Sequence, residues 1–192
     1  PTVPDMADDV ADQWQRLRGG PVRVLALSLG GMVAAEWARQ APHTVTELVL
    51  CNSSFRPYSA PWERFQPRAL SKLLRLLLTA PAALEIETEI LRLSSNRPEA
   101  HAAQLCDWVQ WRQQCPVSAG NVLRQLAAAA RYRAAPAPAV ATRVLSSAGD
   151  RLVSPRCSQR LAAAWKVPLA LHPSAGHDLP LDDPDWLLAQ LV

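Results

Sequence analysis

Two apolar runs, Val22 to Leu27 and Val45 to Cys51, dominate the hydrophobic pattern of the first 54 residues. Both are rich in Val and Leu, and we expect the first to be buried on both faces, as strands of a parallel sheet are. Leu29 to Gln40 between them is typical of a helix. Residues 5–18 are typical of another helix, because acids lie in the first turn and arginines in the last. The order helix, strand, helix, strand predicts a parallel sheet with right-handed crossovers.

The middle of the chain, from Phe55 to about Arg133, contains no convincing strand pattern. Prolines fall at the starts of four apolar–polar segments or between them, and this predicts helices at Arg68–Leu78, Ala82–Leu93, Glu99–Gln113 and Ala119–Tyr132. Leucines at helical spacing mark a packing face on the first helix: Leu70, Leu73, Leu74, Leu77 and Leu78. We expect this face to be buried in the core rather than to bind a membrane, since the charges flanking it are sparse and mixed.

The alternation of strands and helices resumes after the Pro–Ala linker Ala134 to Ala139. Strands are predicted at Val140–Ala148 and Val167–His172, and helices at Pro155–Trp165 and Asp183–Leu191. The sequence therefore predicts an α/β core formed by residues 1–54 and 136–192. A helical segment, residues 55–135, is inserted between these two parts.

Composition and charge exclude several classes of protein. A chain of 192 residues that is 49% hydrophobic is expected to form one globular domain, and a net charge of +3 is too small to indicate a nucleic-acid partner. Residues 56–133 carry 11 basic and 6 acidic side chains, so the inserted segment has a charge of +5 and the remainder −2. The run Leu73 to Leu78 is too short to span a membrane.

Localisation is inferred from the cysteines and from the start of the chain. Cys51, Cys106, Cys115 and Cys157 form no C-x-x-C pair or metal-binding spacing, so we expect reduced, structural thiols in a cytoplasmic protein. No signal peptide is visible, although a chain that begins at Pro1 can have lost an upstream targeting segment.

A candidate nucleophile, Ser28, lies where the first apolar run gives way to the first core helix. The local sequence ALSLGG matches the G-x-S-x-G pattern of a nucleophile elbow with one departure, because Ala26 occupies the position of the first glycine. Small residues at Ala26, Gly30 and Gly31 would let the serine stand on a sharp turn at a helix N-terminus. The backbone N–H of Leu29 would then supply one donor to an oxyanion hole.

Asp150 and His177 follow the third and fourth predicted strands. Loops at the carboxyl ends of parallel strands share one rim of the sheet, so we expect these two residues to lie near Ser28. Four of the seven glycines flank the three residues, which we interpret as evidence for sharp turns: Gly30, Gly31, Gly149 and Gly176. His177 would take the proton of the Ser28 hydroxyl, and Asp150 would orient the imidazole.

Each candidate also has a structural interpretation. Ser28 can be incidental in an ordinary strand–turn–helix, and Asp150 can simply cap the turn that follows its strand. Asp182 or Asp183 is interpreted as the cap of the last helix. The remaining histidines lack a companion motif and are interpreted as structural: His43 in a solvated turn, His101 near a helix start and His172 at a strand end.

The chain resembles the α/β-hydrolase superfamily, and among its members the small carboxylesterases. The matching segments are ALSLGG around Ser28, SSAGDRLVSP around Asp150 and SAGHDLPLDDP around His177, in the chain order Ser, Asp, His of that superfamily. The resemblance covers essentially the whole chain and implies a helical cap at residues 55–135. It implies a small-molecule substrate, and neither a cofactor nor a metal.

The resemblance also implies strands that this chain lacks. Members of the superfamily have three or four strands before the elbow strand, and a loop after one of them supplies the second oxyanion donor. Here only about twenty residues precede the elbow strand, so we expect either a fragment of a longer protein or a reduced form of the fold. The elbow strand would then be an unpaired edge, which favours aggregation or a homodimer.

Two functional hypotheses follow. The first is a serine hydrolase that cleaves carboxylic esters or thioesters, with substrates that include esters bound to an acidic carrier protein. The second is a truncated or inactive hydrolase-fold domain that acts as a binding module. Ser28 argues against haloalkane dehalogenases and epoxide hydrolases, which use an Asp nucleophile, whereas proteases, C–C hydrolases and cofactor-free perhydrolases stay open.

Overall fold

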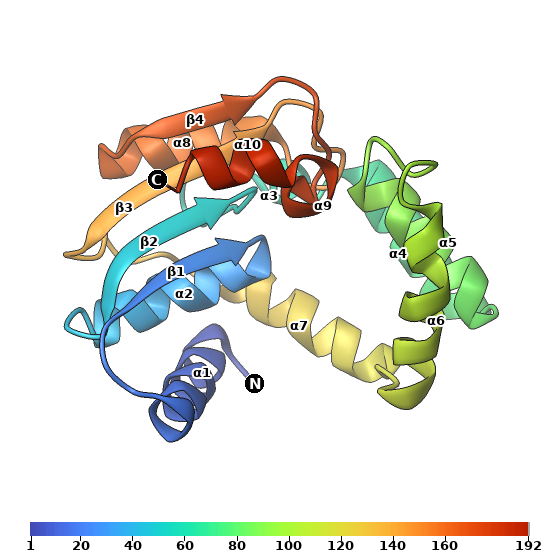
Figure 1. Cartoon of the computed structure of the whole chain (residues 1–192), viewed down its shortest axis with the longest axis horizontal. Helices are drawn as coiled ribbons and strands as arrows, with labels where there is room; N and C mark the ends of the chain where they lie inside the picture. The colour runs from blue at the N-terminus through green and yellow to red at the C-terminus, as the bar shows by residue number, and fades with distance from the viewer. Residues whose placement is uncertain (192) are drawn as a thin grey trace.

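The computed structural model describes residues 1–191 and contains a four-stranded parallel sheet (Figure 1). Its strands lie in the order β1 (Val22–Leu27), β2 (Val45–Cys51), β3 (Ala141–Ser147) and β4 (Leu169–His172). Each strand pairs in parallel with the next one along the chain. The predicted parallel α/β sheet is confirmed, with the last two strands beginning one and two residues later than expected.

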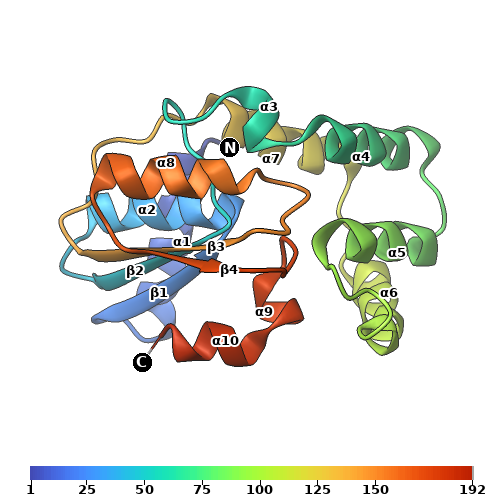
Figure 2. The ribbon, with the colours of Figure 1, turned by 90° about the horizontal axis from the view of Figure 1, so that it is seen from above.

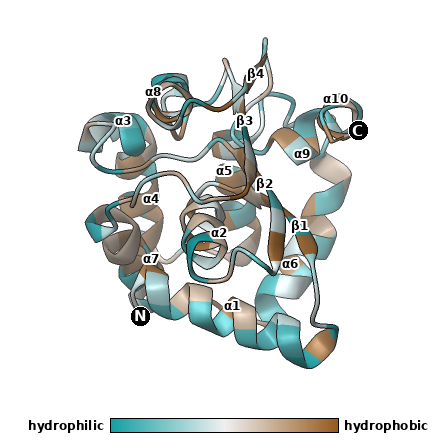
Figure 3. Cartoon of the chain, turned by 90° about the vertical axis from the view of Figure 1, so that its left-hand side faces the viewer, coloured by the Kyte–Doolittle hydropathy of each residue, from teal (hydrophilic) through white to brown (hydrophobic). Residues whose placement is uncertain are grey.

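Helices cover both faces of this sheet (Figure 2). One face is covered by α2 (Leu29–Gln40) and α8 (Pro155–Trp165), and α1 (Val3–Leu17) packs against α2. The other face is covered by the short helices α9 (Leu179–Asp182) and α10 (Pro184–Ala189). In the view of Figure 3, which is turned by 90° from that of Figure 1, much of α1 is hydrophilic, whereas β1 and β2 carry hydrophobic segments.

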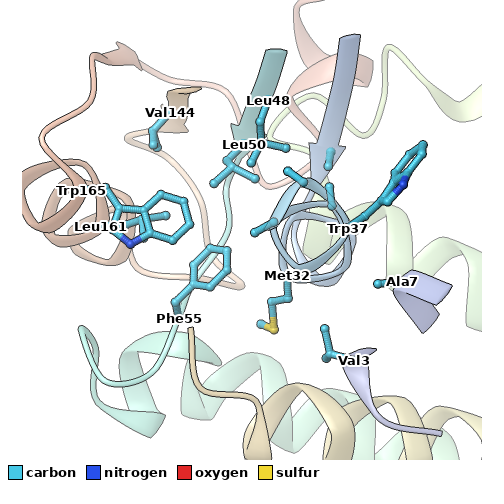
Figure 4. Close-up of a cluster of buried hydrophobic side chains, with 14 of the residues drawn as sticks. Val3, Ala7, Met32, Trp37, Leu48, Leu50, Phe55, Val144, Leu161 and Trp165 are labelled. Atoms are coloured by element: carbon cyan, nitrogen blue, oxygen red, sulfur yellow. The ribbon is translucent and has the colours of Figure 1, made fainter. Parts of the chain in front are cut away.

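The larger hydrophobic cluster fills the space between the sheet and α2, α8 and α1 (Figure 4). Phe55 belongs to this cluster and has no exposed surface, and the centroid of its ring lies 5.5 Å from that of Trp165. Leu48 and Leu50 of β2 project into the same cluster, while Val49 and Cys51 project into the smaller cluster beneath α9 and α10. The alternation along β2 places apolar residues on both faces, and this explains the apolar sequence LVLC at the end of the strand.

The inserted segment consists of helices joined by turns and lies beyond the carboxyl ends of the strands (Figure 1). It contains α3 (Pro61–Arg64), α4 (Pro67–Thr79), α5 (Ala83–Ser94), a 3₁₀ turn (Ala102–Gln104), α6 (Leu105–Gln114) and α7 (Ala119–Arg131). A parallel bridge between Arg56 and Arg133 joins its two ends, and the Ala134 N–H donates to the Arg56 carbonyl at 2.8 Å. The insertion therefore leaves the core and returns to it at one place.

Several elements differ from the sequence prediction. The helix expected from Glu99 begins only at Leu105, because residues 99–104 form turns and the short 3₁₀ segment. The helix expected from Asp183 begins at Pro184. The four-residue helices α3 and α9 were not predicted, since a single turn is too short to show a hydrophobic period.

The leucine face of α4 is not buried as expected. Leu70, Leu74 and Leu78 are 37%, 41% and 86% exposed, whereas Ala69 and Leu76 are the buried residues of the helix. The leucine spacing predicted an apolar stripe on this helix. Whether the stripe is buried depends on the neighbouring elements, which the spacing does not reveal.

The prediction that the first strand is buried on both faces is also wrong. Arg23 is exposed and Leu25 is 40% exposed, while Ala26 is buried. Within residues 1–191, β1 pairs only with β2 and is an edge strand, and α10 covers the sheet mainly over β2 and β3. None of the helices in this range is long and apolar enough to cross a membrane.

Candidate active site

Ser28 occupies the single position between the last residue of β1 and the first residue of α2. Its backbone has φ 54° and ψ −120°, a left-handed conformation that disfavours side chains. Three hydrogen bonds hold it there: the Ser28 N–H donates to the Cys51 carbonyl at 2.9 Å, and the Ser28 carbonyl accepts from the Ser53 hydroxyl at 2.9 Å and the Gly31 N–H at 3.1 Å. This strained strand-to-helix turn has the backbone form expected of a nucleophile elbow.

The glycines around the site act through close approach and not through left-handed turns. A Cβ on Gly31 would lie 2.1 Å from the Ser53 hydroxyl, and Cβ atoms on Gly149 and Gly176 would lie 2.3 and 2.4 Å from atoms of Asn96 and Ser94. Positive φ among the glycines of residues 1–191 occurs only at Gly19 and Gly20. The interpretation of four sharp glycine turns is therefore corrected, and at Gly30 a Cβ would meet open space.

Asp150 and His177 form the second part of the site. Asp150 lies three residues beyond β3, and its Oδ2 lies 2.8 Å from Nδ1 of His177. Its other carboxylate oxygen accepts the N–H groups of Leu152 and Val153 at 2.8 and 2.9 Å. Asp150 and His177 are 6% and 8% exposed, so little water competes for these bonds. Asp150 thus both caps its turn and orients the imidazole.

Asn52 is a site residue that the sequence did not reveal. It is fully buried with φ 46°, and its amide Nδ2 donates to the carbonyl of His177 at 2.8 Å and to the Ser147 hydroxyl at 3.1 Å. Its Oδ1 accepts the Ser147 N–H at 2.8 Å. One side chain therefore ties the ends of β2 and β3 to the His177 loop. The available signal was an Asn directly after an apolar strand, since Asn tolerates the left-handed conformation.

Asp182 and Asn96 join the inserted segment to the loops that carry Asp150 and His177. The Asp182 carboxylate is 3% exposed and accepts the hydroxyl of Ser95, the Asn96 N–H at 2.9 Å and the Gly176 N–H at 2.6 Å. The Asn96 amide donates to the carbonyls of Gly149 and Ser174 at 2.9 Å each. Gly149, which precedes Asp150, is therefore hydrogen-bonded to Asn96 directly after α5. Gly176, which precedes His177, is joined to the same segment through Asp182.

The prediction that Asp182 or Asp183 caps the last helix is confirmed, and the cap is Asp183. Asp183 accepts the Trp186 N–H at 3.0 Å at the start of α10, and this bond lowers the pKa of its carboxyl. Asp178 caps α9 in the same way, and burial raises the pKa of its carboxyl.

Two of the three other histidines lie close to acidic side chains, which the sequence did not show. His172 is buried, its Nδ1 accepts the Ala175 N–H at 2.8 Å, and its Nε2 lies 3.1 Å from Asp183. His101 Nε2 lies 3.6 Å from Asp182. His43 is exposed in a turn, as expected.

Ser28 and His177 both line a cavity of about 600 Å³ between the sheet and the inserted segment. Among residues 1–191 no hydrogen bond joins the Ser28 hydroxyl to the His177 imidazole, so this contact of the expected triad is not formed in the structure. Catalytic contacts often tighten only when substrate binds. Leu29, the first residue of α2, also lines the cavity, and N–H groups at a helix start have no acceptor within the helix.

The walls of this cavity are largely apolar. Its other lining residues come from the core and from α3, α4 and α7: Met32, Ser54, Arg56, Ser59, Pro61, Arg64, Phe65, Leu70, Val122, Gln125, Leu126, Ala129, Ala130, Leu152 and Val153. No Asp or Glu is among them. Within the described part of the chain, no group of three or more His, Cys, Asp or Glu side chains is placed to hold a metal ion.

Comparisons with known proteins agree with this fold. The family described as serine aminopeptidase, S33, matches residues 1–184. An esterase of Thermogutta terrifontis solved with malate bound is 24% identical, with a TM-score of 0.69 over 100% of this chain and 71% of that one. A hydrolase of Pseudomonas aeruginosa is 19% identical, with a TM-score of 0.71 over 99% and 70%.

A dienoate hydrolase is a further structural neighbour. The 2-hydroxy-6-oxo-6-phenylhexa-2,4-dienoate hydrolase of Rhodococcus sp. strain RHA1 is 18% identical, with a TM-score of 0.70 over 96% of this chain and 67% of that one. No curated protein matches the chain in sequence. The parallel sheet, the covering helices and these neighbours define an α/β-hydrolase fold. The chain belongs to the serine aminopeptidase S33 family of that superfamily.

Proposed function

We propose that this protein is a serine hydrolase that cleaves a carboxylic ester or thioester through an acyl-enzyme intermediate. The observation that carries the proposal is the strained turn at Ser28, which opens on the same cavity as the hydrogen-bonded pair His177–Asp150. In this mechanism the Ser28 hydroxyl attacks the acyl carbon, His177 takes its proton and returns it to the leaving group, and Asp150 stabilises the imidazolium. The Leu29 N–H is one donor to the oxyanion.

The cavity favours an ester over the free amino terminus of a peptide. An aminopeptidase must bind an ammonium group, and a carboxylate is the usual partner for it. The lining of the Ser28 cavity contains two arginines and no acid. Arginines would repel an ammonium group, so we place the substrate among acyl esters and thioesters.

A fluorophosphonate probe tests the nucleophile directly. We expect the wild-type chain to be labelled and Ser28→Ala not to be. Asp150→Asn should lower ester hydrolysis by about 10²–10⁴-fold because the imidazole loses its orienting carboxylate. Asp185→Asn, an exposed change of the same type on α10, should leave hydrolysis at the wild-type level. An unlabelled wild type, or equal labelling of Ser28→Ala, would contradict the proposal.

A carrier-bound ester is the extension of this proposal that the charge distribution supports. The inserted segment has a charge of +5 between residues 56 and 133, and an acidic carrier would be attracted to it. Turnover of a carrier-bound ester should then fall as salt rises, while turnover of a small neutral ester should not. Equal salt dependence for the two substrates would count against a carrier.

The alternative is a binding module, and the observation that favours it is the free edge of β1. Leu25 on this strand is 40% exposed, and an edge strand can pair with a second chain. In that case the chain should form a concentration-dependent dimer in sedimentation experiments, and Leu25→Lys should weaken it. A monomer that hydrolyses esters would contradict the alternative.

A further inference from the structure

Arg64 is a buried cation in the wall of the Ser28 cavity. It is the last residue of α3 and is 8% exposed. Its two Nη groups donate to the carbonyls of Ala129 and Ala130 near the end of α7, at 2.6 and 3.4 Å. These are neutral acceptors, so the guanidinium charge has hydrogen bonds but no balancing negative charge from them.

The Nε–H of Arg64 has no partner at all within residues 1–191. A buried donor without an acceptor costs about 1–3 kcal/mol, and more when it is charged. The hydroxyl of Ser59, which lines the same cavity and is 7% exposed, likewise has no nitrogen or oxygen atom as a hydrogen-bond partner. The Cys157 thiol lies beside Ser59, and burial raises its pKa, so it is neutral and supplies no counter-charge.

The charges near Arg64 increase this imbalance. Arg56 lines the same cavity and is close enough to repel the Arg64 charge, so burial and then Arg56 lower the pKa of Arg64. Among the ion pairs within residues 1–191, none includes Arg64 or Arg56, and the neighbouring acid Glu63 is paired with Arg160. Two guanidinium groups therefore face a cavity whose remaining walls are mostly apolar.

We propose that Arg64, with Arg56 and Ser59, binds a carboxylate group of the substrate, so that the hydrolase acts on monoesters or thioesters of dicarboxylic acids. This proposal rests on the hydrolase function given above and names its substrate class. A carboxylate would accept hydrogen bonds from the free Nε–H of Arg64 and from the hydroxyl of Ser59. The apolar wall of the cavity would contact the methylene chain between the two ends of the acid. A phosphonate would present similar oxygens and is the competing anion.

The test compares two esters that differ only at the far end of the acyl chain. Mono-p-nitrophenyl adipate carries a terminal carboxylate, and p-nitrophenyl hexanoate carries a methyl group in its place. Both form the same bond to the Ser28 oxygen with release of p-nitrophenolate, and water then releases adipate or hexanoate. We expect the wild type to favour adipate by about 10- to 100-fold in kcat/KM, the size of a charge-assisted hydrogen bond.

The ratio of the two kcat/KM values is the readout for each variant. Arg56→Gln should reduce the ratio about two- to fivefold because Arg56 is exposed, and Arg64→Gln should reduce it to about 2–5, the preference that Arg56 alone still gives. Arg68→Gln removes the same charge from an exposed position outside the cavity and should keep the wild-type ratio. A suberate–octanoate pair tests a longer chain, and an ω-phosphonoalkanoyl ester that is preferred over both would assign the site to phosphonates instead.

A binding measurement separates failure of this proposal from failure of the hydrolase function. If the chain hydrolyses no ester, calorimetric titration of Ser28→Ala with monomethyl adipate and with methyl hexanoate still measures the preference. The proposal predicts binding of monomethyl adipate about tenfold tighter or more, a preference that is reduced in the double variant with Arg64→Gln. If circular dichroism shows that Arg64→Gln does not fold, the ratio of kcat/KM values for the wild type and its decrease in Arg56→Gln test the proposal instead. No preference for the anionic ester in either experiment would overturn the proposal.

Discussion

At the scale of single residues, the strain of the elbow lies on Ser28 itself. The residue has φ 54°, and three backbone or hydroxyl hydrogen bonds hold it there. A side chain in this region costs about 1–3 kcal/mol, and only the surrounding structure keeps it in place. The fold therefore gives up stability at the residue that we propose as the nucleophile.

We expect Ser28→Gly to have a free energy of unfolding about 1 kcal/mol higher than Ser28→Ala. Both variants lack the hydroxyl, so they differ mainly in the tolerance of glycine for positive φ, which its extra freedom in the unfolded chain partly offsets. Urea denaturation measures the difference. Equal stabilities would show that the turn at Ser28 is not strained.

The adjacent glycines give a matched pair on one helix. Gly31→Ala would place a methyl group 2.1 Å from the Ser53 hydroxyl, which holds the Ser28 carbonyl, and should destabilise the fold by about 1–3 kcal/mol. Gly30→Ala meets open space in the first turn of α2 and should stabilise it by up to about 1 kcal/mol. Thermal unfolding of the two variants is the measurement, and a shift in the same direction for both would contradict the packing described here.

At the scale of elements, Glu36 joins α2 to the end of α7. Its buried carboxylate forms an ion pair with Arg39 and accepts the Tyr132 hydroxyl at 3.0 Å. The hydrogen bond from Arg39 lowers the pKa of Glu36 in spite of its burial. Because the folded pKa is below the unfolded value of 4.5, this stabilisation is fully present above about pH 4.5 and is lost as pH falls through the folded pKa.

Glu36→Gln should accordingly lower the free energy of unfolding by about 1–3 kcal/mol at pH 7. The gap between wild type and variant should shrink as the pH falls below 4.5, because protonation then removes the charge from the wild type as well. Denaturation curves at several pH values measure the gap. Glu85→Gln, at an exposed ion pair on α5, is the control and should change stability by less than about 0.5 kcal/mol. A gap that is independent of pH would contradict the lowered pKa.

At the scale of the whole molecule, the core strands were predictable because each contains a stretch of Val, Leu or Ala close to Gly, Pro or polar residues. Their exposure was not predictable, because burial of Leu25 depends on which element lies beside β1. Local sequence was enough to predict that Ser28, Asp150 and His177 each follow a strand, and therefore that their loops share one rim of the sheet. In contrast, the role of Asn52 and the contact of Asp182 with Asn96 were not predicted, because these partners lie 125 and 86 residues away along the chain. Contacts of that range leave no local pattern.

The four cysteines are divided between the core and the inserted segment. Cys106 and Cys115 are exposed in the inserted segment, whereas Cys51 and Cys157 are buried in the core, and all four are free thiols. Burial, and then the charges of Asp150 and Asp178, raise the pKa of Cys51 to about 12. Because the thiolate is the reactive form, a buried thiol with that pKa is inert until the core opens.

We therefore expect a thiol-specific reagent at pH 8 to modify two cysteines per chain rapidly and all four only in denaturant. Peptide mapping should place the rapid sites at Cys106 and Cys115, and Cys106→Ser should reduce the rapid count to one. The slow modification of Cys51 should follow global opening of the sheet, since this residue ends β2 beneath α9 and α10. Rapid modification of Cys51 in the native chain would show that the carboxyl end of β2, which hydrogen-bonds to Ser28, is open to solvent.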